Sequence, residues 1–433
     1  MVRFNENNEV IRNEEYTAIL AGIQLREDIS YSMEELAGLA EADGVAVAGQ
    51  MIQSLERPNT ATLIGKGKVE ELAELCRNME ADMVIFNDEL SGVQLRNLEE
   101  ALEVRVIDRT ILILDIFADR AVSREGKLQV ELAQLQYRMP RLTGFGRSLS
   151  RLGGGIGTRG PGEKKLETDR RHIAGRIDDI KAELARIGRT RQVQRSGREK
   201  SQIPVVALMG YTNSGKSAIM NRLLQLSERE DKTVSSQNML FATLDTQHRK
   251  ITLEQGSEFI LIDTVGFVSR LPHSLVEAFK STLEEVRYAD LLIHVVDSSY
   301  ENRDFYMEVT NKVIEQIGAG DKDQIVAYNK MDIAKSVPLD VSGHEVVYLS
   351  AKTGENINVL VEKIREKIFG GRVEMTLLIP YQRGDITSYL CENAQIFSME
   401  YEEEGTLLHG KLEREDALRY GSFAVDPGEK SEE

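Results

Sequence analysis

The sequence has no tryptophan and only two cysteines, Cys76 and Cys391, among 433 residues. Two cysteines so far apart argue against a disulfide framework and against a cysteine-based zinc site. No apolar run reaches the ~20 residues that a membrane-spanning helix needs, and the first ten residues lack the apolar core of a secretory signal. We therefore expect a cytoplasmic protein that requires no membrane.

Proline is also scarce, with 8 residues, while hydrophobic residues make up 41% of the chain. This composition excludes a wholly disordered or collagen-like protein. At roughly 100–200 residues per domain, the length predicts about two to four domains. The acidic surface and the lack of a long free zipper favour a monomer.

Charge is distributed unevenly along the chain. The formal net charge is −17, yet residues 120–200 hold 20 lysines and arginines against 9 acidic residues. A basic segment in an acidic protein is typical of a surface that binds a polyanion such as RNA. A solvated helical face is the alternative interpretation.

The N-terminal part alternates strand and helix patterns. Apolar runs predict strands over 16–23, 45–48, 83–86 and 104–107, separated by helical patterns. This alternation indicates a parallel sheet with covering helices. Ser32 and Glu35 have the spacing of a capping box, which predicts a helix that begins at Ser32.

Two apolar seams follow at heptad-like spacing. The first comprises Leu128, Leu132, Leu135 and Met139, and the second comprises Leu166, Ile173, Ile177, Ile180, Leu184 and Ile187. Residues 140–162 between them hold 8 glycines and 2 prolines, which interrupt any helix. The pattern predicts two long antiparallel helices joined by a basic, glycine-rich tip.

A phosphate-loop pattern lies between a predicted strand, 205–209, and a predicted helix, 218–226. Its residues are Gly210, Tyr211, Thr212, Asn213, Ser214, Gly215, Lys216 and Ser217. Glycines let backbone amides surround phosphate oxygens at the start of a helix. Lys216 is predicted to reach the β- and γ-phosphates, and the Ser217 hydroxyl to bind Mg²⁺.

Three further loops follow buried-type strands. Asp263, Thr264, Val265 and Gly266 end one strand, where Asp263 can hold Mg²⁺ through water and the Gly266 amide can meet a γ-phosphate. Asn329, Lys330 and Asp332 end the next one, and Ser350, Ala351 and Lys352 follow a third.

These loops match the chemistry of guanine. The Asp332 carboxylate can accept both N1–H and the 2-amino group, a donor pair that adenine lacks. The Lys330 stem can cover the base plane, Asn329 can brace the loops, and the Ala351 amide can bond the 6-oxo group. Four motifs in this order predict a GTPase.

The predicted fold class is α/β with four parts. These are an N-terminal parallel-sheet α/β domain (1–108), a long antiparallel helical hairpin with the basic tip (109–200), a P-loop GTPase domain (201–371) and a small α+β C-terminal domain with a disordered end (372–433).

The glycine-rich tip, 152–163, with the following 166–171, resembles the signature of the HflX family of translation-factor-related GTPases, as does 61–72. The resemblance covers nearly the whole chain. It implies a ribosome-associated GTPase that binds the large subunit and separates ribosomes into subunits. Lys164 and Lys165 replace the usual Thr-Gln of that signature and add two charges beside the tip.

The same resemblance implies switch residues. Thr243 resembles the threonine that closes over Mg²⁺ and the γ-phosphate, although Thr233 and Thr246 are alternatives. Asn213 resembles an asparagine of potassium-stimulated relatives, so K⁺ is a candidate beside Mg²⁺. Phe267 stands where Ras-like switches carry glutamine. A phenyl ring cannot orient water by hydrogen bonding, so intrinsic hydrolysis should be slow. The side chain that positions the attacking water is unknown. The resemblance implies that the ribosome accelerates turnover.

We expect Arg147, Arg151, Arg159, Lys164 and Lys165 to contact ribosomal RNA. The alternative function is a nucleotide-gated adaptor that docks a protein through its coiled coil, with hydrolysis incidental. A tRNA-modification GTPase is a third hypothesis, but no placed cysteine or flavin loop supports it. The sequence leaves open the physiological trigger, ATP binding by the N-terminal domain, and the role of the C-terminal domain.

Overall fold

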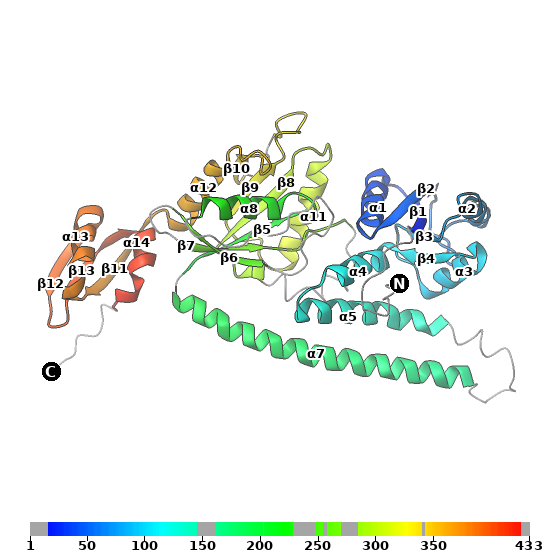
Figure 1. Cartoon of the computed structure of the whole chain (residues 1–433), viewed down its shortest axis with the longest axis horizontal. Helices are drawn as coiled ribbons and strands as arrows, with labels where there is room; N and C mark the ends of the chain where they lie inside the picture. Colours follow the sequence, from blue (N-terminus) through cyan, green and yellow to red (C-terminus); the bar gives the residue numbers. More distant parts are fainter. Residues whose placement is uncertain are drawn as a thin grey trace, which may run out of the picture. The chain divides into compact units, whose positions relative to one another are not determined.

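The computed structural model (Figure 1) describes residues 16–144, 161–201, 203–227, 247–253, 258–269, 285–339 and 343–425. By their contacts these residues form two compact units. The first holds the described residues up to Arg189 together with Val268 and Ser269, and the second holds the rest. Thr243, Arg147, Arg151 and Arg159 lie outside the described residues.

The first unit contains a four-stranded parallel sheet in the order β2-β1-β3-β4. Its strands are β1 (Tyr16–Gln24), β2 (Val45–Ser54), β3 (Met83–Phe86) and β4 (Arg105–Asp108). The connecting helices are α1 (Ser30–Ala42), α2 (Lys66–Asn78) and α3 (Gly92–Leu102). All four residues of β3 are buried, as expected of a parallel strand covered on both faces. The predicted parallel sheet with covering helices is confirmed.

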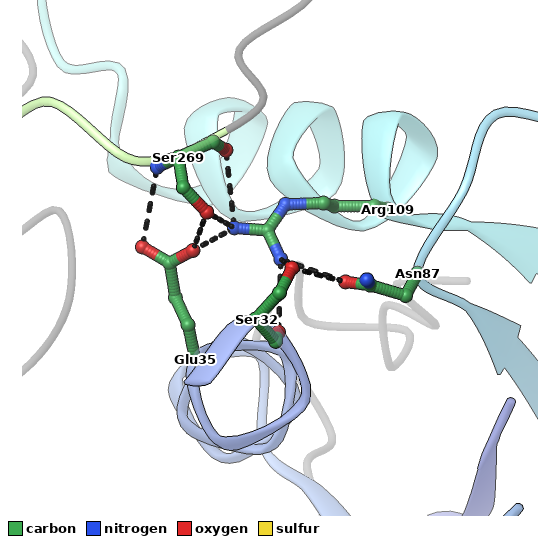
Figure 2. A network of polar contacts seen from close by, with 5 residues as sticks. All are labelled: Ser32, Glu35, Asn87, Arg109 and Ser269. Carbon is green, nitrogen blue, oxygen red and sulfur yellow. Dashed lines mark hydrogen bonds and ion pairs between the residues drawn. The ribbon is translucent and has the colours of Figure 1, made fainter. Parts of the chain in front are cut away.

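The predicted start of the first helix is wrong. Helix α1 begins at Ser30, and no side chain caps it from its N-cap residue, Ile29. Asp28 instead accepts hydrogen bonds from the Ser30 amide at 3.0 Å and from the Ser30 hydroxyl at 2.6 Å. Ser32 and Glu35 therefore lie inside the helix, and their side chains bond residues outside it (Figure 2).

The chain after β4 forms two helices before the glycine-rich segment, where a single one was expected. Helix α4 (Arg109–Arg120) is capped by Asp108, and α5 (Arg124–Arg138) is capped by Ser123, whose hydroxyl accepts the Gly126 amide at 2.9 Å. A short 3-10 turn, Met139–Gly144, follows α5. The second capping residue, Ser123, explains the break, because it favours a new helix start.

Helix α7 (Pro161–Ser201) packs against α5 along the predicted seams. Leu128 and Leu132 of α5 meet Ile177 and Ile180 of α7. Glu131 pairs with Arg176 through two contacts of 2.7 Å, and Arg124 pairs with Glu183. Because rising numbers on α5 match falling numbers on α7, the helices are antiparallel. The first seam is confirmed, as is the second from Ile173 to Ile187. The side chains of Lys164, Lys165 and Leu166 lie outside the described residues.

The second unit is built on a six-stranded sheet in the order β10-β9-β8-β5-β7-β6, parallel except for β6. Its strands are β5 (Val205–Gly210), β6 (Gln247–Thr252), β7 (Glu258–Asp263), β8 (Leu291–Asp297), β9 (Gln324–Asn329) and β10 (Glu345–Tyr348). Its helices are α8 (Lys216–Leu226), α11 (Arg303–Gln316) and α12 (Ile357–Phe369). Parallel strands place their carboxyl ends at one edge of the sheet, where ligands of such folds bind.

A small antiparallel sheet in the order β11-β13-β12 follows in the same unit. It comprises β11 (Arg372–Ile379), β12 (Gln395–Tyr401) and β13 (Thr406–Glu413), with helices α13 (Gly384–Asn393) and α14 (Arg414–Tyr420). Its separate core, which includes Leu377, Leu390 and Leu408, supports the expected α+β class. Helix α14 was not predicted. No described helix is long and apolar enough to cross a membrane.

Candidate functional site: a guanine nucleotide site

The phosphate loop joins the end of β5 to the start of α8. Gly210 has φ +150° and Gly215 has φ +98°, both in the region that favours glycine. A Cβ on Gly210 would lie 2.2 Å from the Val295 carbonyl oxygen, and one on Gly215 would lie 2.1 Å from Asn329 Nδ2. Both positions therefore require glycine.

Lys216 lies at the start of α8 with its ammonium group buried. Its Nζ donates to the carbonyl oxygens of Gly210, at 3.0 Å, and Tyr211, at 2.8 Å. Burial lowers the pKa of Lys216 to about 8, although the nearby Asp263 carboxylate acts in the opposite direction. A bound phosphate would give this buried ammonium a negatively charged partner.

Ser217 and Asp263 bring two oxygen donors together from different elements. The Ser217 hydroxyl donates to Asp263 Oδ2 at 2.6 Å, and Asp263, at the end of β7, is fully buried. Hydroxyl and carboxylate oxygens suit Mg²⁺, so this pair fits the ion. The described residues contain no cluster of three or more His, Cys, Asp or Glu side chains that could hold a metal.

The segment after Asp263 lies against the phosphate loop. The Thr212 amide donates to the Phe267 carbonyl at 2.7 Å, and the Phe267 amide donates to the Gly210 carbonyl at 3.2 Å. A Cβ on Gly266 would lie 2.6 Å from Thr212 Cα. Thr264 turns its hydroxyl to the Leu208 carbonyl at 2.7 Å, and the side chains of Val265 and Phe267 are buried.

Asn329, at the end of β9, connects the phosphate loop to the loop after β10. Its Nδ2 donates to the Ser214 carbonyl at 2.8 Å, and its Oδ1 accepts the Ala351 amide at 2.9 Å. The amide expected to meet the guanine 6-oxo group is thus bonded to Asn329 in this structure. The arrangement holds the phosphate and base loops in one fixed relation.

Asp332 and Lys330 lie beside these loops. Asp332 Oδ1 accepts the Ser350 hydroxyl at 2.7 Å, and the residue is exposed in the loop that follows β9. Lys330 has φ +64° and pairs with Asp297 at 2.7 Å. Asp297, at the end of β8, carries no motif signal and was missed from sequence.

Arg222 of α8 was also missed, because nothing in its sequence context marks it. Its Nε donates to the Ala351 carbonyl at 2.7 Å, and an Nη donates to the Lys352 carbonyl at 2.5 Å. Arg222 therefore fixes the backbone of the base loop from the helix that begins at the phosphate loop.

We expect Arg222→Met to weaken GDP binding by roughly tenfold, because two charge-assisted hydrogen bonds to the base loop are lost. Titration with a fluorescent GDP analogue measures this. Arg365→Met is the matched control, since Arg365 of α12 pairs with Glu415 instead. Equal affinities for the two variants would contradict the positioning role of Arg222.

A parallel sheet with a phosphate loop after β5 and a guanine-type loop after β9 defines a P-loop GTPase. Residues 205–330 match the family model described as 50S ribosome-binding GTPase. Residues 30–118 match GTP-binding GTPase N-terminal, and 120–198 match GTP-binding GTPase Middle Region.

The chain belongs to the GTPase HflX family. It is 47% identical to GTPase HflX of Caldanaerobacter subterraneus, covering 96% of this chain and 95% of the relative. GTPase HflX of Escherichia coli is 40% identical, over 90% of this chain and 92% of the relative. A GTP-binding protein of Sulfolobus solfataricus, solved with GDP, is 24% identical with a TM-score of 0.44, covering 81% of this chain and 98% of that one. The chain is therefore an enzyme that hydrolyses GTP.

Proposed function

We propose that this GTPase binds the large ribosomal subunit and couples GTP binding and hydrolysis to ribosome association and subunit separation. The joined phosphate and base loops of the second unit, held by Asn329 and Arg222, carry the nucleotide part of the proposal. The matching models and relatives support the ribosome part. The division into four domains, 1–108, 109–200, 201–371 and 372–433, is part of the same proposal.

In this proposal the amides of 210–217 and Lys216 bind the phosphates, and Gly266 meets the γ-phosphate. Ser217 and Asp263, the latter through water, hold Mg²⁺ with Thr243, and the ion neutralises phosphate charge. Asn329, Lys330, Asp332, Ser350, Ala351 and Lys352 form the guanine site. We also propose that K⁺ binds near Asn213. Equal GTPase rates in sodium chloride and potassium chloride would contradict this part of the proposal.

The basic helical hairpin is the proposed RNA-binding part. On its described portion, Arg170, Arg171, Lys181 and Arg189 of α7 are exposed. Polyanion binding at such a surface depends on summed charge. RNA contact by the tip residues 147–165 rests on the family resemblance and the charge pattern.

We expect charge reversal of Arg147, Arg151 and Arg159 together to weaken co-sedimentation with ribosomes at least tenfold, because phosphate contacts become repulsive. GTP affinity should stay unchanged. Sedimentation of purified ribosomes with the protein and GTP, GDP or a non-hydrolysable analogue measures both association and subunit separation.

The adaptor alternative makes different predictions in the same assay. An adaptor would keep its partner after RNase treatment, and ribosomes would leave its GTPase rate unchanged. Unaltered pelleting of the triple variant would count against RNA contact through the hairpin tip.

A further inference from the structure

Tyr211, the second residue of the phosphate loop, packs its ring against a residue of a different element. Its ring centroid lies 4.3 Å from that of Tyr306, and the two ring planes are inclined at 45°. Tyr306 belongs to α11, a helix that packs against β5 and β8 in the second unit. The aromatic pair therefore connects the phosphate loop to α11 within one unit.

Tyr306 is itself held by its neighbours. The Tyr300 ring lies 5.4 Å away with its plane inclined at 62°, and the Phe305 ring lies 5.6 Å away at 69°. Edge-on arrangements of this kind are favourable for aromatic rings. The Tyr306 carbonyl also accepts the hydroxyl of the fully buried Thr310 at 3.0 Å. Tyr306 can therefore act as a fixed support for the ring that packs against it.

Tyr306 supports the Tyr211 ring beside an empty space in the protein. A cavity next to the two rings is lined by both of them and by His294, Val296 and Thr310. In the part of the chain that the structure describes, neither ring belongs to the apolar core of the six-stranded sheet. Without the Tyr306 ring, the cavity would extend along Tyr211 and give its side chain room to move. The contact with Tyr306 therefore limits where the Tyr211 ring can lie.

The support reaches the phosphate loop through the backbone of Tyr211. The Tyr211 carbonyl accepts Lys216 Nζ at 2.8 Å and the Ser214 amide at 3.3 Å. The residue before it is Gly210, and glycine restricts its own dihedral angles little, so Gly210 alone does not fix Tyr211. A displaced Tyr211 ring would therefore move the carbonyl that orients the Lys216 ammonium.

We propose that Tyr306 is a positioning residue for nucleotide binding, whose ring holds Tyr211 and, through it, the phosphate loop and Lys216. The inference rests on the proposed phosphate-binding role of residues 210–217. A loop that is held in place before the nucleotide arrives loses less conformational freedom on binding, so the nucleotide binds more tightly. GDP and GTP share the α- and β-phosphates that such a loop surrounds, so the support acts on both nucleotides.

The test uses the full-length chain and its Tyr306→Leu and Tyr306→Phe variants. We expect Tyr306→Leu to weaken GDP binding roughly fivefold and to raise KM for GTP by about the same factor, because a favourable ring contact is lost. The value of kcat should stay within about twofold of the wild type, since the support is equal in the ground state and the transition state. Tyr306→Phe keeps the ring and should bind GDP as the wild type does.

A double-substitution cycle tests whether Tyr306 acts through Tyr211. Tyr211→Leu alone should weaken GDP binding by a similar factor, and the addition of Tyr306→Leu should weaken it no further. Tyr389→Leu is the matched control, because Tyr389 of α13 also pairs with a tyrosine ring, that of Tyr420, at 6.2 Å. It should leave GDP affinity, KM and kcat unchanged.

Unchanged GDP affinity in a folded Tyr306→Leu variant overturns the inference, and so does an equal loss in Tyr306→Phe. Losses that multiply in the double variant also contradict it, because Tyr306 would then act independently of Tyr211. Tyr306→Met replaces Tyr306→Leu if thermal melting shows that the latter does not fold. If Lys216→Met keeps its GDP affinity, the proposed phosphate site fails together with the inference. If Lys216→Met loses affinity while Tyr306→Leu does not, only the inference fails.

Discussion

Lys216→Met is expected to abolish useful nucleotide binding while leaving the fold intact. The buried ammonium contacts the phosphate loop directly, through the carbonyl oxygens of Gly210 and Tyr211. Removing one member of a desolvated charge pair costs about 2–5 kcal/mol in binding free energy, which is at least thirtyfold in affinity. Titration with fluorescent GDP and GTP analogues measures the loss.

The same substitution should not destabilise the nucleotide-free protein. Burial lowers the pKa of Lys216 to about 8, below its ordinary 10.5. The unfolded chain therefore binds this proton more tightly than the folded one. As a result, the contribution of Lys216 to the free energy of unfolding rises as pH increases from about 8 toward 10.5. Methionine carries no charge, so it avoids the free-energy cost of burying an ammonium group. The unfolding temperature of the variant at neutral pH should therefore equal or exceed that of the wild type.

Lys363→Met provides the control for this prediction, because Lys363 of α12 pairs with Glu345 at 3.4 Å. It should bind GDP normally. A Lys216→Met chain that melts earlier than both others would show that binding was lost through unfolding. In that case the phosphate role of Lys216 would lack support from this experiment.

The sequence predicts most of this fold because its signals are local. The strands at 83–86 and 205–209 are short apolar runs, and the heptad spacing around Leu128 and Ile177 needs only counting. Each nucleotide motif follows such a strand. The parallel sheet then brings the motif loops to one edge, whatever the details of packing.

The misjudged and missed residues depend on partners distant in sequence. Glu35 has the spacing of a capping residue, yet its carboxylate meets Arg109 and Ser269. Arg222 gains its role only from carbonyl groups 129 and 130 positions away. No periodicity or motif encodes such pairings, because they arise only when the units fold.

Asp332→Asn is expected to convert the base preference from guanine to xanthine. A carboxylate accepts both guanine donors, whereas a side-chain amide offers one acceptor and one donor. That amide donor faces the guanine 2-amino group, and two donors cannot bond. Xanthine has a 2-oxo group there, so its N1–H and 2-oxo group complement asparagine. The Ser350 hydroxyl donates to Asp332 Oδ1 at 2.7 Å and can donate equally to the side-chain oxygen of asparagine.

A mismatch between hydrogen-bonding groups in a closed site costs two or more orders of magnitude in affinity. We therefore expect GDP affinity to fall on the order of 100-fold and xanthosine diphosphate affinity to rise by a similar factor. Competition of each nucleotide against the same fluorescent probe measures both affinities. Asp321→Asn, at an exposed position before β9, is the matched control. Loss of both nucleotides together would mean that Asp332 supports the loop fold and does not read the base edge.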